Sequence, residues 1–128
     1  MRKGFTLIEL IVSIAILVIA VFGVNELLKQ GITVARRAEK LTVAVNIAQA
    51  EIETALSMQY ATLPVGTYEA RHIVFEKYAR QTTINYIDPN TLQTTTTNTG
   101  LKKINATVFY PLPGGEKSYT LSTIITEQ

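Results

Sequence analysis

The chain has 128 residues, no cysteine, and 12 lysine and arginine residues against 10 aspartate and glutamate residues, for a formal net charge of +2. The absence of cysteine excludes disulfides, thiolate metal sites and cysteine nucleophiles. The near-balanced charge excludes a strong field for steering nucleic acid or acidic lipid.

The first predicted element is an apolar segment, residues 5–24, that is long enough to cross a membrane. From Leu10 to Val24 nothing is more polar than Ser13. At about 1.5 Å per residue, a helix of this length spans about 30 Å, the thickness of a bilayer's hydrocarbon core. Arg2 and Lys3 precede the segment without a balancing acid, so the positive-inside rule predicts a cytoplasmic N-terminus and an exported remainder.

A removable secretory signal is the alternative interpretation of such a segment. Residues 21–31 offer no polar stretch that ends in the small-x-small pattern of a signal peptidase site. We therefore expect an anchored chain, and an unprocessed single-pass membrane protein is a further alternative.

Glu9 is the one acid inside the apolar segment. A carboxylate at the centre of a membrane helix costs about 2.5–3.5 kcal/mol on insertion scales, and less near an end, so an acid there is a candidate for function. The structural alternative is a side chain that reaches the lipid headgroups and has no further role.

The string Arg2 to Gly4, followed by Phe5 to Glu9 and then by aliphatic residues, resembles the prepilin signature of type IV pilins and type II secretion pseudopilins. The resemblance implies that a membrane aspartyl peptidase cleaves between Gly4 and Phe5. It also implies that the same enzyme methylates the freed amine of Phe5, and that Glu9 neutralises the amine of a neighbouring subunit during assembly.

In this interpretation Arg2 and Lys3 supply the charge of a discarded leader. The implied partners are the prepilin peptidase and methylase, other pilin or pseudopilin subunits, an inner-membrane assembly platform and, before assembly, the lipid bilayer. Glu9 lies about 6 Å along a helix from Phe5, so an axial stagger can bring one chain's amine to the next chain's carboxylate. Either charge left unpaired in an apolar bundle would be costly.

The chain is expected to divide into a cleaved leader at 1–4, a transmembrane and assembly helix at 5–24, an amphipathic exported helix at 25–60 and a β-sheet domain at 61–128 that includes a loop at 88–103. Apolar residues recur at steps of three and four from Leu28 to Ala55, which predicts one nearly continuous helix from about Thr6 to about Met58. Pro64 to Gly66 predicts the turn that follows it.

Beyond this turn, segments rich in Val, Ile, Thr, Tyr and Phe predict strands at 71–87, 104–110 and 118–125. Pro111 to Gly115 predicts a hairpin turn between the last two. The polar run within 88–103 is interpreted as a mobile linker, with a partner-reading loop or a glycosylated tract as alternatives. We therefore expect an α+β, type IV pilin-like fold with a long N-terminal helix packed on a small antiparallel sheet of about three strands.

Two features favour a minor subunit of that family. Segments 46–53, 101–108 and 119–123 resemble V-type minor pilins and I-type minor pseudopilins. The chain also lacks the cysteine pair of many major pilins, and its only aspartate, Asp88, cannot supply the acidic calcium site of many major pseudopilins.

Catalytic patterns are absent from the sequence. His72 is the only histidine, and alone it makes neither a metal site nor a triad. Glu51 and Glu53 should point to different faces of a helix, which does not suit acid–base work. Lys102 and Lys103, with Tyr110 and Tyr119 nearby, could form a nucleic-acid patch, but we interpret them as protection of a strand edge against aggregation. We expect no enzyme activity, no metal and no cofactor. Nucleic acid is not an expected partner, although it is kept as an alternative.

The predicted function is that of a minor pilin or pseudopilin: a membrane-anchored subunit, processed by prepilin peptidase, that assembles into or primes a type IV pilus or a type II secretion pseudopilus. A tip adhesin, a DNA-uptake (competence) subunit and a major pilin are the alternatives. The predicted location is the bacterial inner membrane, with a single pass, a cytoplasmic N-terminus and an exported C-terminal domain, and then the pilus or pseudopilus.

Overall fold

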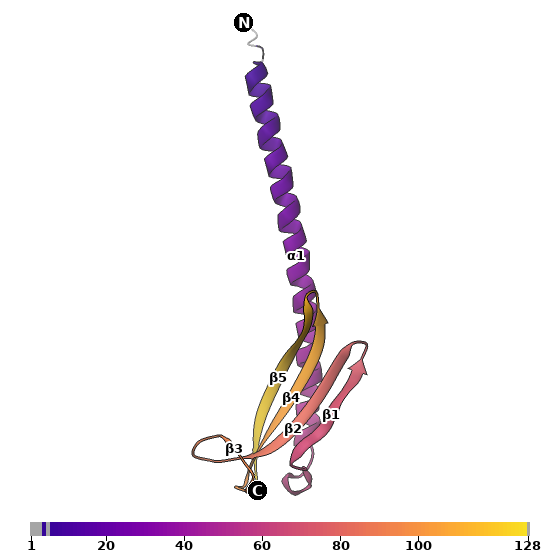
Figure 1. Cartoon of the computed structure of the whole chain (residues 1–128), viewed down its shortest axis with the longest axis vertical. Helices are drawn as coiled ribbons and strands as arrows, with labels where there is room; N and C mark the ends of the chain where they lie inside the picture. Colours follow the sequence, from indigo (N-terminus) through magenta and orange to yellow (C-terminus); the bar gives the residue numbers. More distant parts are fainter. Residues whose placement is uncertain (1–3, 5, 128) are drawn as a thin grey trace. The chain divides into compact units, whose positions relative to one another are not determined.

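The computed structural model describes Gly4 and residues 6–127, and it has an α+β fold (Figure 1). Its elements are α1 (Leu7–Leu56), the 3₁₀ turn η1 (Tyr60–Thr62), β1 (Gly66–Phe75), β2 (Tyr78–Ile87), β3 (Thr94–Thr95), β4 (Leu101–Leu112) and β5 (Gly115–Thr126). The expected fold class is confirmed, but the sheet has five strands where about three were expected.

The chain forms two compact units, and the division falls inside α1 between Arg37 and Ala38. Among the described residues of the first unit, Gly4 and Thr6 precede α1 and all the others belong to it. The second contains the C-terminal part of α1 and the whole sheet. Helix α1 is continuous from Leu7 to Leu56, close to the predicted span.

The sheet is antiparallel throughout, in the order β1-β2-β4-β5, and the short β3 pairs with β2. Strand β4 is central and shows the strict alternation of a strand with one covered face. Its covered residues are Lys102, Ile104, Ala106, Val108 and Tyr110. The partners of these residues on the neighbouring strands lie on the same face of the sheet.

The core lies between this face and the C-terminal part of α1. Ala44, Ala48 and Ala55 are fully buried there, against the side chains of Ile84 and Ile104. The alanines recur at helical spacing, so they share the stripe of α1 that packs on the sheet. Packing against these small residues therefore fixes which stripe of α1 faces the sheet.

The prediction of one strand over residues 71–87 was wrong, because this segment contains the turn between β1 and β2. The turn lies at Glu76 and Lys77, and Glu76 has a φ of 46°. A residue other than glycine, asparagine or aspartate seldom adopts this left-handed conformation. No turn-forming residue type therefore marked the hairpin. The turn between β4 and β5 was predicted correctly, since Gly114 and Gly115 both have positive φ values there.

The loop predicted over residues 88–103 is shorter in the structure, because parts of this segment belong to strands. It contains β3, and β4 begins at Leu101. Asp88 Oδ1 accepts hydrogen bonds from the backbone N–H groups of Asn90 at 2.7 Å and Thr91 at 3.1 Å. The backbone N–H of Asp88 also donates to the carbonyl oxygen of Gln93. These local bonds give the segment a defined turn rather than the form of a free linker.

The interpretation of Lys102 as protection of a strand edge was wrong. Strand β4 has a neighbour on each side, and Lys102 is only 3% exposed. Its Nζ donates to the carbonyl oxygens of Tyr60 and Leu63, both at 2.7 Å, and lies 4.3 Å from the centre of the Tyr60 ring. Burial lowers the pKa of Lys102, and the nearby charge of Glu127 opposes that effect in part. Lys102 therefore ties the turn after α1 to the sheet.

Candidate functional site

The start of α1 is fixed by a side-chain cap. The hydroxyl oxygen of Thr6 accepts a hydrogen bond from the backbone N–H of Glu9 at 3.4 Å, and the carbonyl oxygen of Thr6 accepts one from Leu10 at 3.2 Å. Thr6 is thus the N-cap residue, and Glu9 is the third residue of the helix. Thr-x-x-Glu is also the spacing of a capping box. Sequence reasoning missed this role of Thr6, although the Thr-x-x-Glu spacing signals it.

Glu9 lies in the first turn of α1, where the helix dipole favours a negative charge. Its side chain is exposed, and it forms no ion pair with any residue that the structure describes. The carbonyl oxygen of Glu9 accepts a hydrogen bond from the hydroxyl of Ser13 at 2.7 Å. The backbone of Glu9 is therefore satisfied within the helix, while its carboxylate is open to a cation from outside.

The surface around this carboxylate is apolar. Leu7 is 77% exposed, Ile8 71% and Ile11 58%. Helix α1 contains an 18-residue window with a mean hydropathy of 2.9, none of it buried. By length and composition this part of α1 could cross a membrane. Such a surface requires lipid or other apolar helices to cover it.

Gly4 is exposed and lies outside the helix. A Cβ atom placed on Gly4 would meet nothing within 4 Å. The fold of the chain therefore does not require glycine at this position. Arg2, Lys3 and Phe5, the other residues predicted for processing and assembly, lie outside the described residues.

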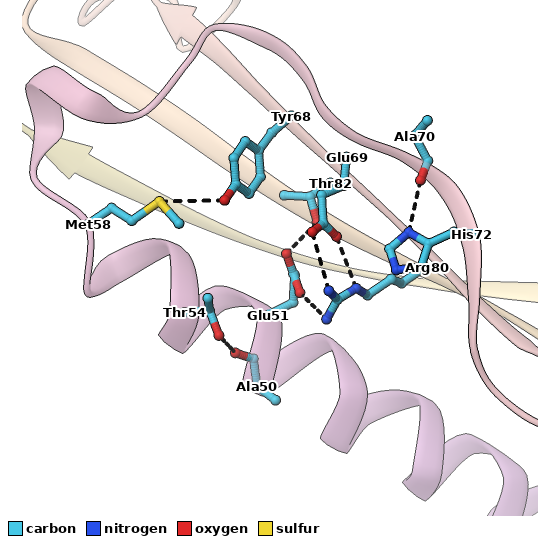
Figure 2. A network of polar contacts seen from close by, with 10 residues as sticks. All are labelled: Ala50, Glu51, Thr54, Met58, Tyr68, Glu69, Ala70, His72, Arg80 and Thr82. Carbon is cyan, nitrogen blue, oxygen red and sulfur yellow. Dashed lines mark hydrogen bonds and ion pairs between the residues drawn. The ribbon is translucent and has the colours of Figure 1, made fainter.

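A second group of charged residues joins α1 to β1 and β2 (Figure 2). Glu51, on α1, is only 2% exposed. Its carboxylate forms an ion pair with Arg80 and accepts a hydrogen bond from the hydroxyl of Thr82 at 3.0 Å. Arg80 also forms an ion pair with Glu69 of β1, with 3.0 Å between Nε and Oε2. One guanidinium group is thus shared between two carboxylates.

This network is structural rather than catalytic in its arrangement. The two carboxylate oxygens of its one fully buried acid, Glu51, contact Arg80 and Thr82, so the network offers no free general base. As predicted, Glu53 lies away from Glu51, on an exposed part of the helix. His72 Nδ1 lies 3.1 Å from the carbonyl oxygen of Ala70, outside the network. Within the described part of the chain, no group of three or more His, Cys, Asp or Glu residues is placed to hold a metal.

The N-terminal site coincides with a known motif. Residues 1–25 match the family model described as the prokaryotic N-terminal methylation motif. No curated protein and no solved structure matches the chain. The match includes the Gly4–Phe5 bond, the cap at Thr6 and the carboxylate of Glu9. It does not extend to the sheet.

Proposed function

We propose that this chain, whose N-terminal methylation motif is that of the type IV prepilin-like family, is a minor pilin or pseudopilin that assembles into or primes a filament. One observation carries the proposal. The motif covers the start of a helix whose surface is apolar and exposed, and the carboxylate of Glu9 in its first turn forms no ion pair with any described residue. A membrane accommodates such a helix, and a bundle of like helices accommodates it after assembly.

Processing would act at the Gly4–Phe5 bond. Cleavage there removes Arg2 and Lys3, so the count of lysine and arginine falls from 12 to 10 and equals the 10 acidic residues. The new N-terminus is the amine of Phe5, which the same enzyme would methylate. A mature chain without its basic leader has lost the charges that hold an N-terminus in the cytoplasm.

Glu9 would then serve assembly. A methylated amine keeps its positive charge, and an apolar bundle gives it no water. The carboxylate of Glu9 on a neighbouring subunit is a partner that compensates this charge. Because each charge is costly alone, pairing favours the axial stagger that brings them together. The cap at Thr6 supports this role, since it satisfies the backbone at Glu9 without using the carboxylate.

Before assembly, the chain would be anchored in the inner membrane with its sheet domain exported. The prepilin peptidase, the assembly platform and other subunits are the proposed partners. The alternative of a nucleic-acid-binding subunit is less well supported than the sequence suggested. Lys102, which had been considered for that role, is buried and bound to two carbonyl oxygens.

A comparison of strains with and without an active prepilin peptidase tests the proposal. In the active strain, the chain should appear in the sheared filament fraction or in purified pseudopili. In the inactive strain, it should remain entirely in the membrane fraction. An equal distribution between fractions in both strains would contradict a role that depends on processing.

A further inference from the structure

We propose that the face of the sheet turned away from α1 binds an acidic sugar, a hexuronate, in a polar hollow beside Lys103. This open face carries the residues of β2, β4 and β5 that alternate with the covered ones. The hollow has a volume of about 310 Å³, at the lower end of the range of about 300–1,000 Å³ typical of small-molecule pockets. It is lined mainly by Asn85, Leu92, Gln93, Thr94, Lys103 and Asn105.

The floor of the hollow is built by the two central strands. Lys103 lies on the open face of β4, and Asn85 of β2 is its direct cross-strand partner. Asn105 follows two positions along β4, so it lies on the same face. Strand β4 has a neighbour on each side, so the expectation that Lys103 protects a strand edge was wrong. The strands instead place one ammonium group between two amide side chains.

The wall of the hollow is the loop between β2 and β3. Ile87 shares the open face with Asn85, yet it is only 1% exposed, because this loop covers it. Leu92 on the loop has a φ of 58°, a conformation that leucine seldom adopts and that is often kept at ligand-binding positions. The backbone N–H of Leu92 donates to the carbonyl oxygen of Asp88 at 2.8 Å, so the wall is held in place without a ligand.

The charge of the hollow suits a monoanion. Lys103 is the one charged residue in the lining, and it forms no ion pair with any described residue. Asp88 and Glu127, which precede the loop and follow β5, lie outside the lining, and Asp88 Oδ1 already accepts two backbone hydrogen bonds. A single ammonium matches the charge of one carboxylate. A phosphate group, with a charge of about −1.5 to −2, calls for more positive charge than Lys103 supplies.

The uncharged groups of the hollow suit the ring of a sugar. The amides of Asn85, Gln93 and Asn105 and the hydroxyl of Thr94 can both donate and accept hydrogen bonds, as sugar hydroxyls do. Asn105 Oδ1 accepts a hydrogen bond from the hydroxyl of Ser122 at 2.7 Å, which leaves its NH₂ group as a donor. Leu92 adds an apolar contact for the C–H groups of a ring. A carboxylate without a ring would leave most of these groups unused.

Sodium glucuronate is the probe that tests the proposal. The full chain is held in detergent micelles, and binding is measured by titration with saturation-transfer difference NMR. Glucuronate should bind at least about tenfold more tightly than glucose, which lacks the carboxylate, and than acetate, which lacks the ring, because each of these keeps only part of the hydrogen bonding. Inorganic phosphate should not displace glucuronate.

Substitutions in the hollow test which residues hold the probe. Lys103→Gln should weaken glucuronate binding at least about tenfold, since it removes the charge-assisted hydrogen bond to the carboxylate. Lys117→Gln is the matched control, because it removes the same charge from an exposed residue of β5 that pairs with Tyr110, at the other end of the sheet. It should leave binding unchanged.

Gln93→Ala is a second variant, on the exposed wall of the hollow, whose change does not touch the sheet. It should weaken binding about threefold, as expected for the loss of one neutral hydrogen bond. It keeps the test valid if the loss of Lys103 disturbs β4.

Three results would overturn the proposal: glucose that binds as tightly as glucuronate, acetate or phosphate that does so, or glucuronate binding that both Lys103→Gln and Gln93→Ala leave unchanged. The site is independent of the proposed filament role. Because the test uses the unprocessed chain and no filament, its failure is distinct from failure of the prepilin role, which the peptidase comparison reports.

Discussion

The hydroxyl oxygen of Thr6 accepts a hydrogen bond from the backbone N–H of Glu9, with 3.4 Å between the two atoms. The bond uses only the backbone of Glu9 and leaves its carboxylate for another role. The backbone of Glu9 takes part in the helix cap, whereas its carboxylate remains exposed in the first turn. A substitution that changes only the side chain of Glu9 can therefore remove the charge and leave the start of the helix in place.

We predict that Glu9→Gln and Glu9→Ala leave the protein in the membrane but sharply reduce its entry into filaments. The reason is that the amine of a neighbouring subunit then lacks a counter-charge in an apolar bundle. Quantification of the protein in membrane and filament fractions measures the effect. Ser13→Ala is the matched control, since it removes a neighbouring polar group without changing charge. Normal incorporation of Glu9→Gln would contradict the pairing role.

We predict that Gly4→Ala slows or blocks cleavage without harming the fold. A Cβ at Gly4 meets nothing within 4 Å, so any effect must arise in the active site of the peptidase. Immunoblots that follow precursor and mature chain over time measure the rate. Gly23→Ala is the control, because Gly23 has equally open surroundings but lies inside α1. Equal cleavage rates for the two variants would argue against a requirement for glycine at the cleavage site.

We predict that Arg80→Leu destabilises the sheet domain more than Glu51→Leu does. Loss of Arg80 leaves the buried Glu51 carboxylate without its ion pair, at a cost of about 3–5 kcal/mol. Loss of Glu51 leaves Arg80 paired with Glu69 on the half-exposed side of the network, which should cost less. Urea unfolding of the full chain in detergent measures both. The double variant should be more stable than Arg80→Leu alone, and the reverse order of the two single variants would contradict the account.

The pKa of Lys102 predicts a specific dependence of stability on pH. Because burial lowers this pKa below 10.5, the unfolded chain binds more protons than the folded chain between the lowered pKa and 10.5. The contribution of Lys102 to the free energy of unfolding therefore rises with pH through that window. The pKa values of Tyr60 and Tyr78 are raised, mainly by burial. Their contributions to the free energy of unfolding therefore fall above about pH 10, which opposes the rise from Lys102.

Lys102→Met isolates this effect. At neutral pH the variant leaves the carbonyl oxygens of Tyr60 and Leu63 without their donor, which costs about 1–3 kcal/mol. The difference in free energy of unfolding between the native chain and the variant should then grow in favour of the native chain as pH rises toward 10.5. Unfolding curves at several pH values measure it. A difference that is constant or shrinks would contradict the direction of the pKa shift.

The parts of the fold that were predictable carry local signals. The apolar run and the three- and four-residue periodicity predicted α1, and Pro111 to Gly115 predicted the β4–β5 turn. The β1–β2 turn was missed because Glu76 adopts a left-handed conformation in a segment of strand-forming residues. A chain of β-branched and aromatic residues gives no local sign of where it reverses.

The long-range polar contacts were beyond prediction from one sequence. Glu51 and Thr82 are 31 positions apart, and Lys102 contacts Tyr60 across 42 positions. Whether a lysine near a strand end is buried depends on which strands flank it, and the missed β1–β2 hairpin changed that arrangement. The N-terminal site was accessible to sequence reasoning because its residues are neighbours in the chain.

The mass of the N-terminus is the most direct test of the central claim. The full protein is extracted from a strain with an active prepilin peptidase and analysed by mass spectrometry without prior digestion. The account predicts a chain that begins at Phe5 and carries one added methyl group at its amine. A chain that still begins at Met1 would contradict both the cleavage at Gly4 and the assembly role that depends on it.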